Sequence, residues 1–244
     1  MINPRLIARL DIKNSNLIKS INLEGLKIIG NPNDYAKKYY DDGADEILFM
    51  DSVATLYGRN NLADIIYNST KDIFIPITVG GGIRSFQDVR SMLNSGADKV
   101  AINTAAVKNP NFIKDLANTI GSQSIIISIE AKKQGQNWEV YTSNGRDPTG
   151  KDVVEWVKQV EKLGAGEILL TSIDQEGTRK GFDLDLNKAV VSATNLPVIS
   201  SGGFGEIDHA KNLIDSCQIS AIALADALHY KRYKLSEIKN RLTI

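Results

Sequence analysis

The sequence is poor in cysteine and has no excess of either charge. Cys217 is its single cysteine, so the chain cannot form an internal disulfide, and 29 basic side chains balance 29 acidic ones. A neutral chain lacks the positive surface that binds nucleic acid or an anionic membrane. Apolar runs of the ~20 residues that span a membrane are missing, as is an apolar signal-peptide core at the N-terminus. These absences favour a cytoplasmic enzyme or enzyme subunit.

Signals for bound metals, cofactors and separate domains are missing as well. His209 and His229 have no Cys, His or acidic partners at metal-ligand spacing, and Cys217 has no histidine nearby in the sequence. We therefore expect no metal and no cofactor, and interpret Cys217 as a small buried residue. No low-complexity linker divides the chain, so residues 1–244 are predicted to form one domain.

Two patterns alternate regularly along the chain. Short apolar, β-branched runs are typical of buried parallel strands, and the longer amphipathic segments between them are typical of helices. Cap signals such as Ser85 and the Asn109-Pro110 pair open several helices. The predicted strands are 6–11, 46–51, 75–79, 99–103, 124–130, 167–171, 197–201 and 221–225. The predicted helices are 33–43, 61–69, 86–95, 110–119, 151–163, 185–194, 207–216 and 235–242.

This alternation is typical of a (β/α)8 barrel, a fold of about 250 residues. A doubly wound sheet is the alternative, but its Gly-x-Gly-x-x-Gly motif does not follow the first predicted strand. An internal repeat favours the barrel, because 164–169 resembles 43–48 and 197–203 resembles 76–82, each at an offset of 121 residues. That offset is half of the chain, so we predict a barrel built from two duplicated half-barrels.

Acidic residues end the first predicted strand of each half, Asp11 and Glu130. Catalytic groups of such barrels lie at the C-terminal ends of the strands, and the first and fifth strands are opposite each other in a ring of eight. The two carboxylates are therefore predicted to face each other across one mouth. They suit acid–base catalysis if their environments separate their pKa values. Two solvated acids at strand ends are the structural alternative.

Glycines follow the third and seventh predicted strands, at 80–82 and 202–203. Glycine lets backbone N–H groups approach a phosphate closely, and a following helix adds its dipole. Asn103 and Thr104, at the end of the fourth strand, supply further donors beside Gly82. The duplicated glycines predict a long substrate with a phosphate at each end, although tight turns also use glycine.

Four charged residues lie at or near the opposite ends of the strands: Arg5, Glu46, Lys99 and Glu167. Two bases and two acids there can form a closed, salt-bridged ring. From the residues alone we interpret this ring as a structural plug that seals the barrel bottom.

From about Arg5 to Leu242 the chain resembles a known family. The most specific stretches are 78–84 (Thr-Val-Gly-Gly-Gly-Ile-Arg), 96–106 (Gly-Ala-Asp-Lys-Val-Ala-Ile-Asn-Thr-Ala-Ala) and 164–174 (Gly-Ala-Gly-Glu-Ile-Leu-Leu-Thr-Ser-Ile-Asp). On these strings it resembles the cyclase subunit of imidazole glycerol phosphate synthase, the HisF family of histidine biosynthesis. The resemblance implies a (β/α)8 barrel and a lyase that receives ammonia from a HisH-like glutaminase partner in a heterodimer.

The implied reaction joins ammonia to a bis-phosphorylated ribulosyl aminoimidazole carboxamide ribotide. Its products are imidazole glycerol phosphate and aminoimidazole carboxamide ribotide. The resemblance assigns catalysis to Asp11 and Glu130. It also implies that the charged ring is a gate through which ammonia enters the barrel, and not only a structural plug. It implies the remaining roles as follows: Lys19 in a mobile loop over the substrate, Gly82, Asn103 and Thr104 at one phosphate, Gly177 and Gly203 at the other, Thr171 in the substrate site, and Asp98 and Gln123 against the glutaminase.

Departures from the family pattern lie at the substrate end. Glu130 stands where aspartate is usual, and its extra methylene shifts the carboxylate by about 1.5 Å. A misplacement on that scale can lower a rate ~100-fold. Asp226 stands where a small residue or serine is usual, and it would repel a phosphate unless it pointed to solvent. Asn144 and Glu176 are milder exchanges for serine and aspartate.

Three functions are compatible with these residues. We expect the active cyclase subunit. The alternative is a HisF-like subunit that channels ammonia to a sugar amidotransferase in surface-polysaccharide biosynthesis, with little or no cyclase activity. The third is the sister isomerase of histidine biosynthesis, which shares the half-barrel duplication but not the charged ring.

Overall fold

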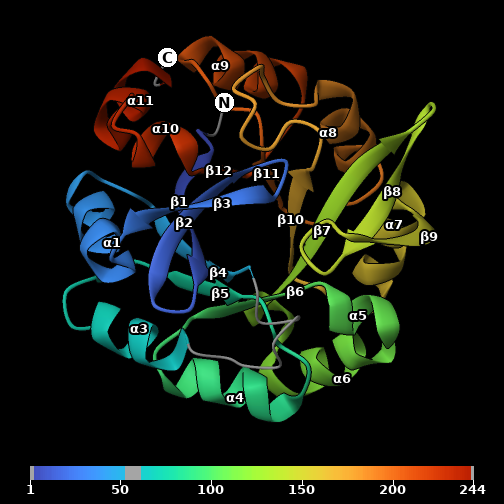
Figure 1. Ribbon diagram of the computed structural model, residues 1–244. Helices are drawn as coiled ribbons and strands as arrows, with labels where there is room; N and C mark the ends of the chain where they lie inside the picture. The colour runs from blue at the N-terminus through green and yellow to red at the C-terminus, as the bar shows by residue number, and fades with distance from the viewer. Residues whose placement is uncertain (1–2, 53–61, 243–244) are drawn as a thin grey trace.

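The computed structural model describes residues 3–52 and 62–242 of the chain (Figure 1). Within these residues, eight parallel strands pair in sequence order and the last pairs with the first, so the ring closes. The prediction of a (β/α)8 barrel is confirmed. The barrel strands are β1 (Arg5–Lys13), β4 (Glu46–Asp51), β5 (Ile77–Gly80), β6 (Lys99–Ile102), β7 (Ile125–Gln134), β10 (Glu167–Ser172), β11 (Val198–Ser201) and β12 (Ala221–Leu224).

Helices surround this ring and cover its outer face (Figure 1). The longer ones are α1 (Pro32–Asp41), α3 (Leu62–Ser69), α4 (Phe86–Asn94), α6 (Asn111–Ile120), α7 (Val153–Lys162), α8 (Leu184–Val191), α9 (Ile207–Ser216) and α11 (Leu235–Leu242). Ser85 and Asp88 form the capping box that opens α4, as the sequence signal indicates. The predicted start of one helix at residue 61 lies outside the described residues. None of the described helices combines the length and apolar character that a membrane span requires.

Two hairpins extend the barrel beyond the sequence prediction. The segment after the first barrel strand, expected as a loop, forms β2 (Asn16–Ile21) and β3 (Glu24–Gly30), and the segment after β7 forms β8 (Asn137–Thr142) and β9 (Asp147–Asp152). The helix predicted from residue 151 therefore begins at Val153, where the Asp152 side chain accepts from the N–H groups of Val154 and Glu155. Two short helices, α5 (Thr104–Lys108) and α10 (Asp226–His229), were also not predicted.

The two halves of the barrel repeat in three dimensions. Strands β4 and β5 begin at Glu46 and Ile77, and their counterparts β10 and β11 begin at Glu167 and Val198. Both strands that carry the predicted acids, β1 and β7, continue into an antiparallel hairpin. The residues before α5 and α10 share an unusual backbone conformation, with φ −122° and ψ −83° at Asn103 and φ −131° and ψ −74° at Ala225. The sequence repeat thus corresponds to two similar half-barrels.

The interior of the barrel is apolar in its middle. Side chains from several strands meet there as a buried cluster of their own, separate from the larger core between strands and helices. The cluster contains Ile7, Leu48, Met50, Ala101, Ile126, Leu169, Ile199, Ala221 and Ala223. All of these except Met50 are branched or small residues, and together they form a packed layer of the kind that fills such barrels. This layer separates the charged residues at the strand starts from the polar residues at the strand ends.

Candidate active site

The structure brings the two predicted acids to one mouth. Strands β1 and β7 lie four places apart in the ring of eight, so Asp11 and Glu130 stand on opposite sides of its C-terminal end. Both residues are buried, with exposed fractions of 2% and 6%. The alternative of two solvated strand-end acids is therefore wrong. The catalytic role of the pair stays a prediction.

Asp11 is held as a carboxylate by a neighbouring arginine. The Nε atom of Arg9, two residues earlier on β1, donates to Asp11 Oδ1 at 2.9 Å, and both side chains are buried. Burial alone would raise the pKa of Asp11, but the charges of Arg9 and Lys19 outweigh it and hold that pKa below its ordinary value. Asp11 is therefore negatively charged at neutral pH.

Glu130 has the opposite electrostatic environment. Its Oε2 accepts a hydrogen bond of 2.7 Å from the backbone N–H of Gly145, in the turn between β8 and β9. No lysine or arginine of the described chain forms an ion pair with it. Burial raises the pKa of Glu130 to about 7, although the Gly145 N–H and the Arg9 charge act in the other direction. The two acids thus have well-separated pKa values, as an acid–base pair requires.

Lys19 lies in the β2 strand. Its ammonium group forms a buried ion pair with Glu176, which follows β10. Burial lowers the pKa of this lysine, but the carboxylates of Glu176 and Asp11 more than reverse the effect and raise it. The expected loop lysine is therefore a charged side chain inside the mouth, fixed by an acid from the opposite half-barrel.

A cavity of about 470 Å³ opens beside Glu130. The three residues predicted to hold one phosphate, Gly82, Asn103 and Thr104, all line it, together with Asn144. Asn103 Nδ2 donates to the backbone carbonyl of Tyr141 at 3.0 Å, which fixes this side chain beneath the β8–β9 hairpin. The buried Oδ1 of Asn103 has no hydrogen-bond partner within the described residues. The structure thus gathers the predicted phosphate donors and one predicted acid around a single space.

The second predicted phosphate site is nearly filled. Gly177 and Gly203 line a cavity of only about 20 Å³ together with Asp226. Asp226 does not point to solvent, because it is 7% exposed and accepts two hydrogen bonds from Arg179, at 2.6 and 3.0 Å. At Gly203, with φ +106°, an added Cβ would lie 1.9 Å from the carbonyl oxygen of Gly181. The close approach of the backbone accounts for this glycine whether or not a phosphate binds there.

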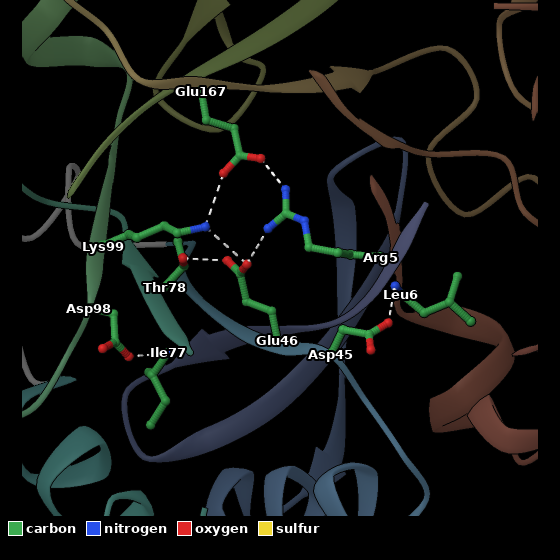
Figure 2. Close-up of polar contacts among 9 residues, drawn as sticks. All are labelled: Arg5, Leu6, Asp45, Glu46, Ile77, Thr78, Asp98, Lys99 and Glu167. Atoms are coloured by element: carbon green, nitrogen blue, oxygen red, sulfur yellow. Dashed lines mark hydrogen bonds and ion pairs between the residues drawn. The ribbon is translucent and has the colours of Figure 1, made fainter. Parts of the chain in front are cut away.

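The four charged residues at the strand starts form a closed ring (Figure 2). Arg5 pairs with Glu46 at 2.6 Å and with Glu167, and Lys99 pairs with the same two acids at 3.1 Å each. Thr78 donates a hydrogen bond of 2.5 Å to the second oxygen of Glu46. The bases and acids alternate around the barrel axis, so each charge has an opposite charge on both sides. The closed ring predicted from the residues is therefore present, and its role as a plug or as an ammonia gate stays a prediction.

The two residues predicted to face the partner lie just before the starts of β6 and β7, at the same end of the barrel as the ring. Asp98 and Gln123 are both exposed, and Asp98 also accepts a hydrogen bond of 2.8 Å from the backbone N–H of Ile77 (Figure 2). Phe74, three residues before the start of β5, has 77% of its surface exposed. Phe74 thus lies at the end of the barrel where the strands begin, and its exposure was not predicted from the sequence.

Two arginines of the mouth were also missed, Arg9 and Arg179. Arg9 donates through Nη1 to Thr171 Oγ1 at 3.0 Å and to Ser201 Oγ at 3.1 Å. Thr171 keeps its own O–H group as a donor, and its role in the substrate site stays a prediction. The signal for Arg9 was present, because a period of two from Arg5 places Arg9 and Asp11 on the inner face of the same strand. Arg179 carried no such signal, since it lies in the irregular segment between β10 and α8.

His229 is a packing residue of the same region. Its Nδ1 lies 2.7 Å from the Tyr39 hydroxyl oxygen, and burial lowers its pKa to about 4. It is therefore neutral at neutral pH. Across residues 3–52 and 62–242, histidine, cysteine and acidic side chains do not gather in groups of three or more that would hold a metal ion.

Comparison with known proteins identifies the family. Residues 5–234 match the model of a family described as histidine biosynthesis protein. The chain belongs to this family. A Legionella pneumophila protein named imidazole glycerol phosphate synthase subunit HisF is 62% identical over 209 residues, which cover 85% of this chain and 99% of the relative.

HisF proteins from more distant organisms are similar over nearly the whole chain. The HisF subunit of Pyrococcus furiosus is 47% identical over 98% of this chain and 95% of its own length. That of Thermococcus onnurineus is 44% identical over 99% of this chain and 96% of its own length. The resemblance to the HisF family found in the sequence is therefore confirmed, and the relatives' names describe those proteins as subunits.

Proposed function

We propose that the protein is the cyclase subunit of imidazole glycerol phosphate synthase. It joins ammonia to a bis-phosphorylated ribulosyl aminoimidazole carboxamide ribotide and releases imidazole glycerol phosphate and aminoimidazole carboxamide ribotide. The observation that carries the proposal is the pair of acids at the mouth. Asp11 is ionised, Glu130 titrates near neutral pH, and a cavity of about 470 Å³ lies beside Glu130.

The two acids divide the proton transfers between them. When ammonia adds to a carbonyl carbon, imine formation and release of water move two protons from the nitrogen to the oxygen. In each transfer the Asp11 carboxylate accepts a proton from the nitrogen and Glu130 in its acid form donates one to the oxygen, and proton exchange with solvent restores both groups. Because the pKa of Glu130 is about 7, both of its forms are present at neutral pH and it can exchange its proton in either direction.

Substrate binding uses both sides of the mouth differently. Backbone and side-chain donors at Gly82, Asn103 and Thr104 hold one phosphate in the open cavity. On the other side Arg179 and Arg232 both pair with Asp226, and a phosphate there competes with Asp226 for these two cations. The Lys19–Glu176 ion pair links the β2–β3 hairpin to the segment after β10 and holds the hairpin over the mouth.

A glutaminase partner supplies the ammonia in this proposal. It docks on the rim that presents Asp98, Gln123 and the exposed Phe74, and it delivers ammonia to the ring of Arg5, Glu46, Lys99 and Glu167. The apolar interior layer above the ring suits a neutral ammonia molecule and disfavours ammonium, because a buried charge without a partner is costly. The single cysteine agrees with a cytoplasmic location for such a complex.

The proposal is tested with the purified chain, the bis-phosphorylated substrate and an ammonium salt, without a partner. We expect formation of aminoimidazole carboxamide ribotide, and loss of this turnover in Asp11→Asn. Asp41→Asn is the matched control, because Asp41 makes an exposed ion pair with Lys37 far from the mouth. A folded wild-type protein that forms no product at saturating ammonia would contradict the proposal. Restored growth of a histidine auxotroph that lacks its own cyclase would support it over ammonia channelling to a sugar amidotransferase.

A further inference from the structure

Arg9 is a permanent cation inside the barrel. It is 3% exposed and makes hydrogen bonds to three side chains: Asp11 on its own strand, Thr171 on β10 and Ser201 on β11. Its side chain therefore reaches across the interior past β12, which lies between β1 and β11 in the ring. Below it lies the apolar interior layer that includes Ile7 on the same strand. The guanidinium thus forms the boundary between the apolar interior and the reactive mouth.

Arg9 forms a hydrogen bond with only one of the two carboxylate oxygens of Asp11. One carboxylate oxygen, Oδ1, accepts from Arg9 Nε. The other oxygen, Oδ2, is buried and has no hydrogen-bond partner among the described residues. A buried acceptor without a partner costs free energy in the resting protein, and native structures keep few of them. An incoming N–H group is a partner that this oxygen lacks.

We propose that Arg9 is a positioning residue for the reaction: it holds Asp11 as an oriented carboxylate with one free oxygen, which faces the incoming N–H group, while Glu130 in its acid form supplies the proton for the leaving oxygen. This inference rests on the proposed cyclase function. The guanidinium is suited to the task because its donors are fixed in one plane. The contacts with Thr171 and Ser201 fix that plane relative to two neighbouring strands, so the direction of the free Asp11 oxygen is fixed as well.

The other charged groups around Asp11 do not replace Arg9. Lys19 on β2 lowers the pKa of Asp11 through space, but its hydrogen bond goes to Glu176. His229 in α10 has a pKa of about 4 and is neutral near pH 7. Glu130 on β7 and Glu176 are acids, so their charges oppose ionisation of Asp11. Arg9 is thus the cation in direct contact with Asp11.

The decisive measurement is the titration of buried carboxyl groups by infrared difference spectroscopy, on protein labelled with ¹³C in aspartate side chains. In Arg9→Met we expect the pKa of Asp11 to rise by about one to three units, which is the usual effect of losing a neighbouring arginine. In Arg9→Met/Asp11→Asn that signal disappears, which assigns it. In Arg9→Lys the charge remains, so Asp11 stays ionised as in the wild type. Lys37→Met, which removes an exposed ion pair with Asp41, is the control: it affects only the signal of Asp41 and leaves the titration of Asp11 unchanged.

Turnover with ammonium distinguishes the effect of the Arg9 charge from the effect of its hydrogen-bond geometry. We expect kcat of Arg9→Met to fall about 100-fold with little change in KM, and Arg9→Lys to recover only part of it, because an ammonium group cannot reproduce the planar contacts. An Asp11 titration in Arg9→Met like that of the wild type overturns the inference, and so does a wild-type kcat in Arg9→Lys. If Arg9→Met does not fold, Arg9→Lys still decides by its kcat. If Arg9→Met raises the pKa of Asp11 as expected but the wild-type protein shows no turnover, the cyclase function is refuted and the electrostatic role of Arg9 is not.

Discussion

Glu130 Oε2 lies 2.7 Å from the backbone nitrogen of Gly145, so the acid on β7 is tied to the turn of its own hairpin. The added methylene of this glutamate therefore has a structural use, because it carries the carboxylate to the β8–β9 turn. The same hydrogen bond acts against the effect of burial on the pKa of Glu130, which is nevertheless raised to about 7. Glu130 is thus both a contact of the β8–β9 turn and a group that titrates near neutral pH.

Glu130→Gln should abolish proton exchange and change the pH dependence of stability. We expect turnover to fall by a factor of about 10² to 10⁴, the usual contribution of a general acid. In the wild type the pKa rises from 4.5 to about 7 on folding, so the favourable contribution of protonated Glu130 is complete below pH 4.5 and is lost as pH rises through 7. This amounts to about 3 kcal/mol.

The measurement is urea unfolding of both proteins between pH 4 and pH 8, and the quantity to compare is their difference. His229 contributes in the opposite direction, because its pKa is lowered to about 4 on folding and stability is lost as pH falls below 6.5. This histidine is present in both proteins, so its effect cancels. A constant difference across this range would contradict the raised pKa of Glu130.

Lys99→Met should lower turnover driven by glutamine but not turnover driven by added ammonium. The lysine bridges Glu46 and Glu167, and without it the two acids share only Arg5, so the ring rearranges. With a glutaminase partner present, we expect glutamine-driven turnover to fall at least about tenfold, a change of ~1.4 kcal/mol in the barrier. Ammonium-driven turnover should change little, since the mouth is untouched. Equal loss with glutamine and with ammonium would argue against a gate.

Asp226→Asn should tighten binding of the doubly phosphorylated substrate. The substitution removes a buried negative charge from the second phosphate site and releases Arg179 from its ion pair. We expect KM to fall about tenfold, equivalent to ~1.4 kcal/mol of binding. A fragment with a single phosphate, bound on the Gly82 side, should show no change. Asp185→Asn, at an exposed position of α8, is the matched control, and a rise in KM for Asp226→Asn would mean that this acid helps to bind the substrate.

Phe74→Ala should weaken binding of the glutaminase partner without affecting the fold. The side chain is 77% exposed, so its loss removes little buried surface from the isolated chain. A large aromatic residue at an interface commonly contributes 2 kcal/mol or more, so we expect the Kd to rise by roughly 10- to 100-fold in calorimetry. Ile28→Ala is the control, because Ile28 is similarly exposed but lies in the β2–β3 hairpin at the other end of the barrel. Equal effects of the two variants on the Kd would show that Phe74 does not lie in the interface.

The core of the fold was readable from sequence because the barrel repeats one local rule. The barrel strands are buried on both faces, so most of them contain a short apolar run, and the repeat at an offset of 121 residues shows that both halves follow the same order. The hairpins were missed because their strands do not all follow this rule. In β9, which reads Asp-Pro-Thr-Gly-Lys-Asp, the exposed strand has no apolar period to detect.

The sequence by itself determined the barrel, the opposition of Asp11 and Glu130, and the grouping of four charges at one end, because these depend only on strand order and on which end of a strand a residue occupies. The tertiary structure decided how the charges pair. It assigned Arg9 to Asp11, Lys19 to Glu176 and Arg179 to Asp226, and left Glu130 with a backbone N–H. Pairing of this kind fixes which acid is ionised and which titrates, and it depends on distances between strands that are remote in sequence. The protonation state of the site is therefore a property of the closed barrel.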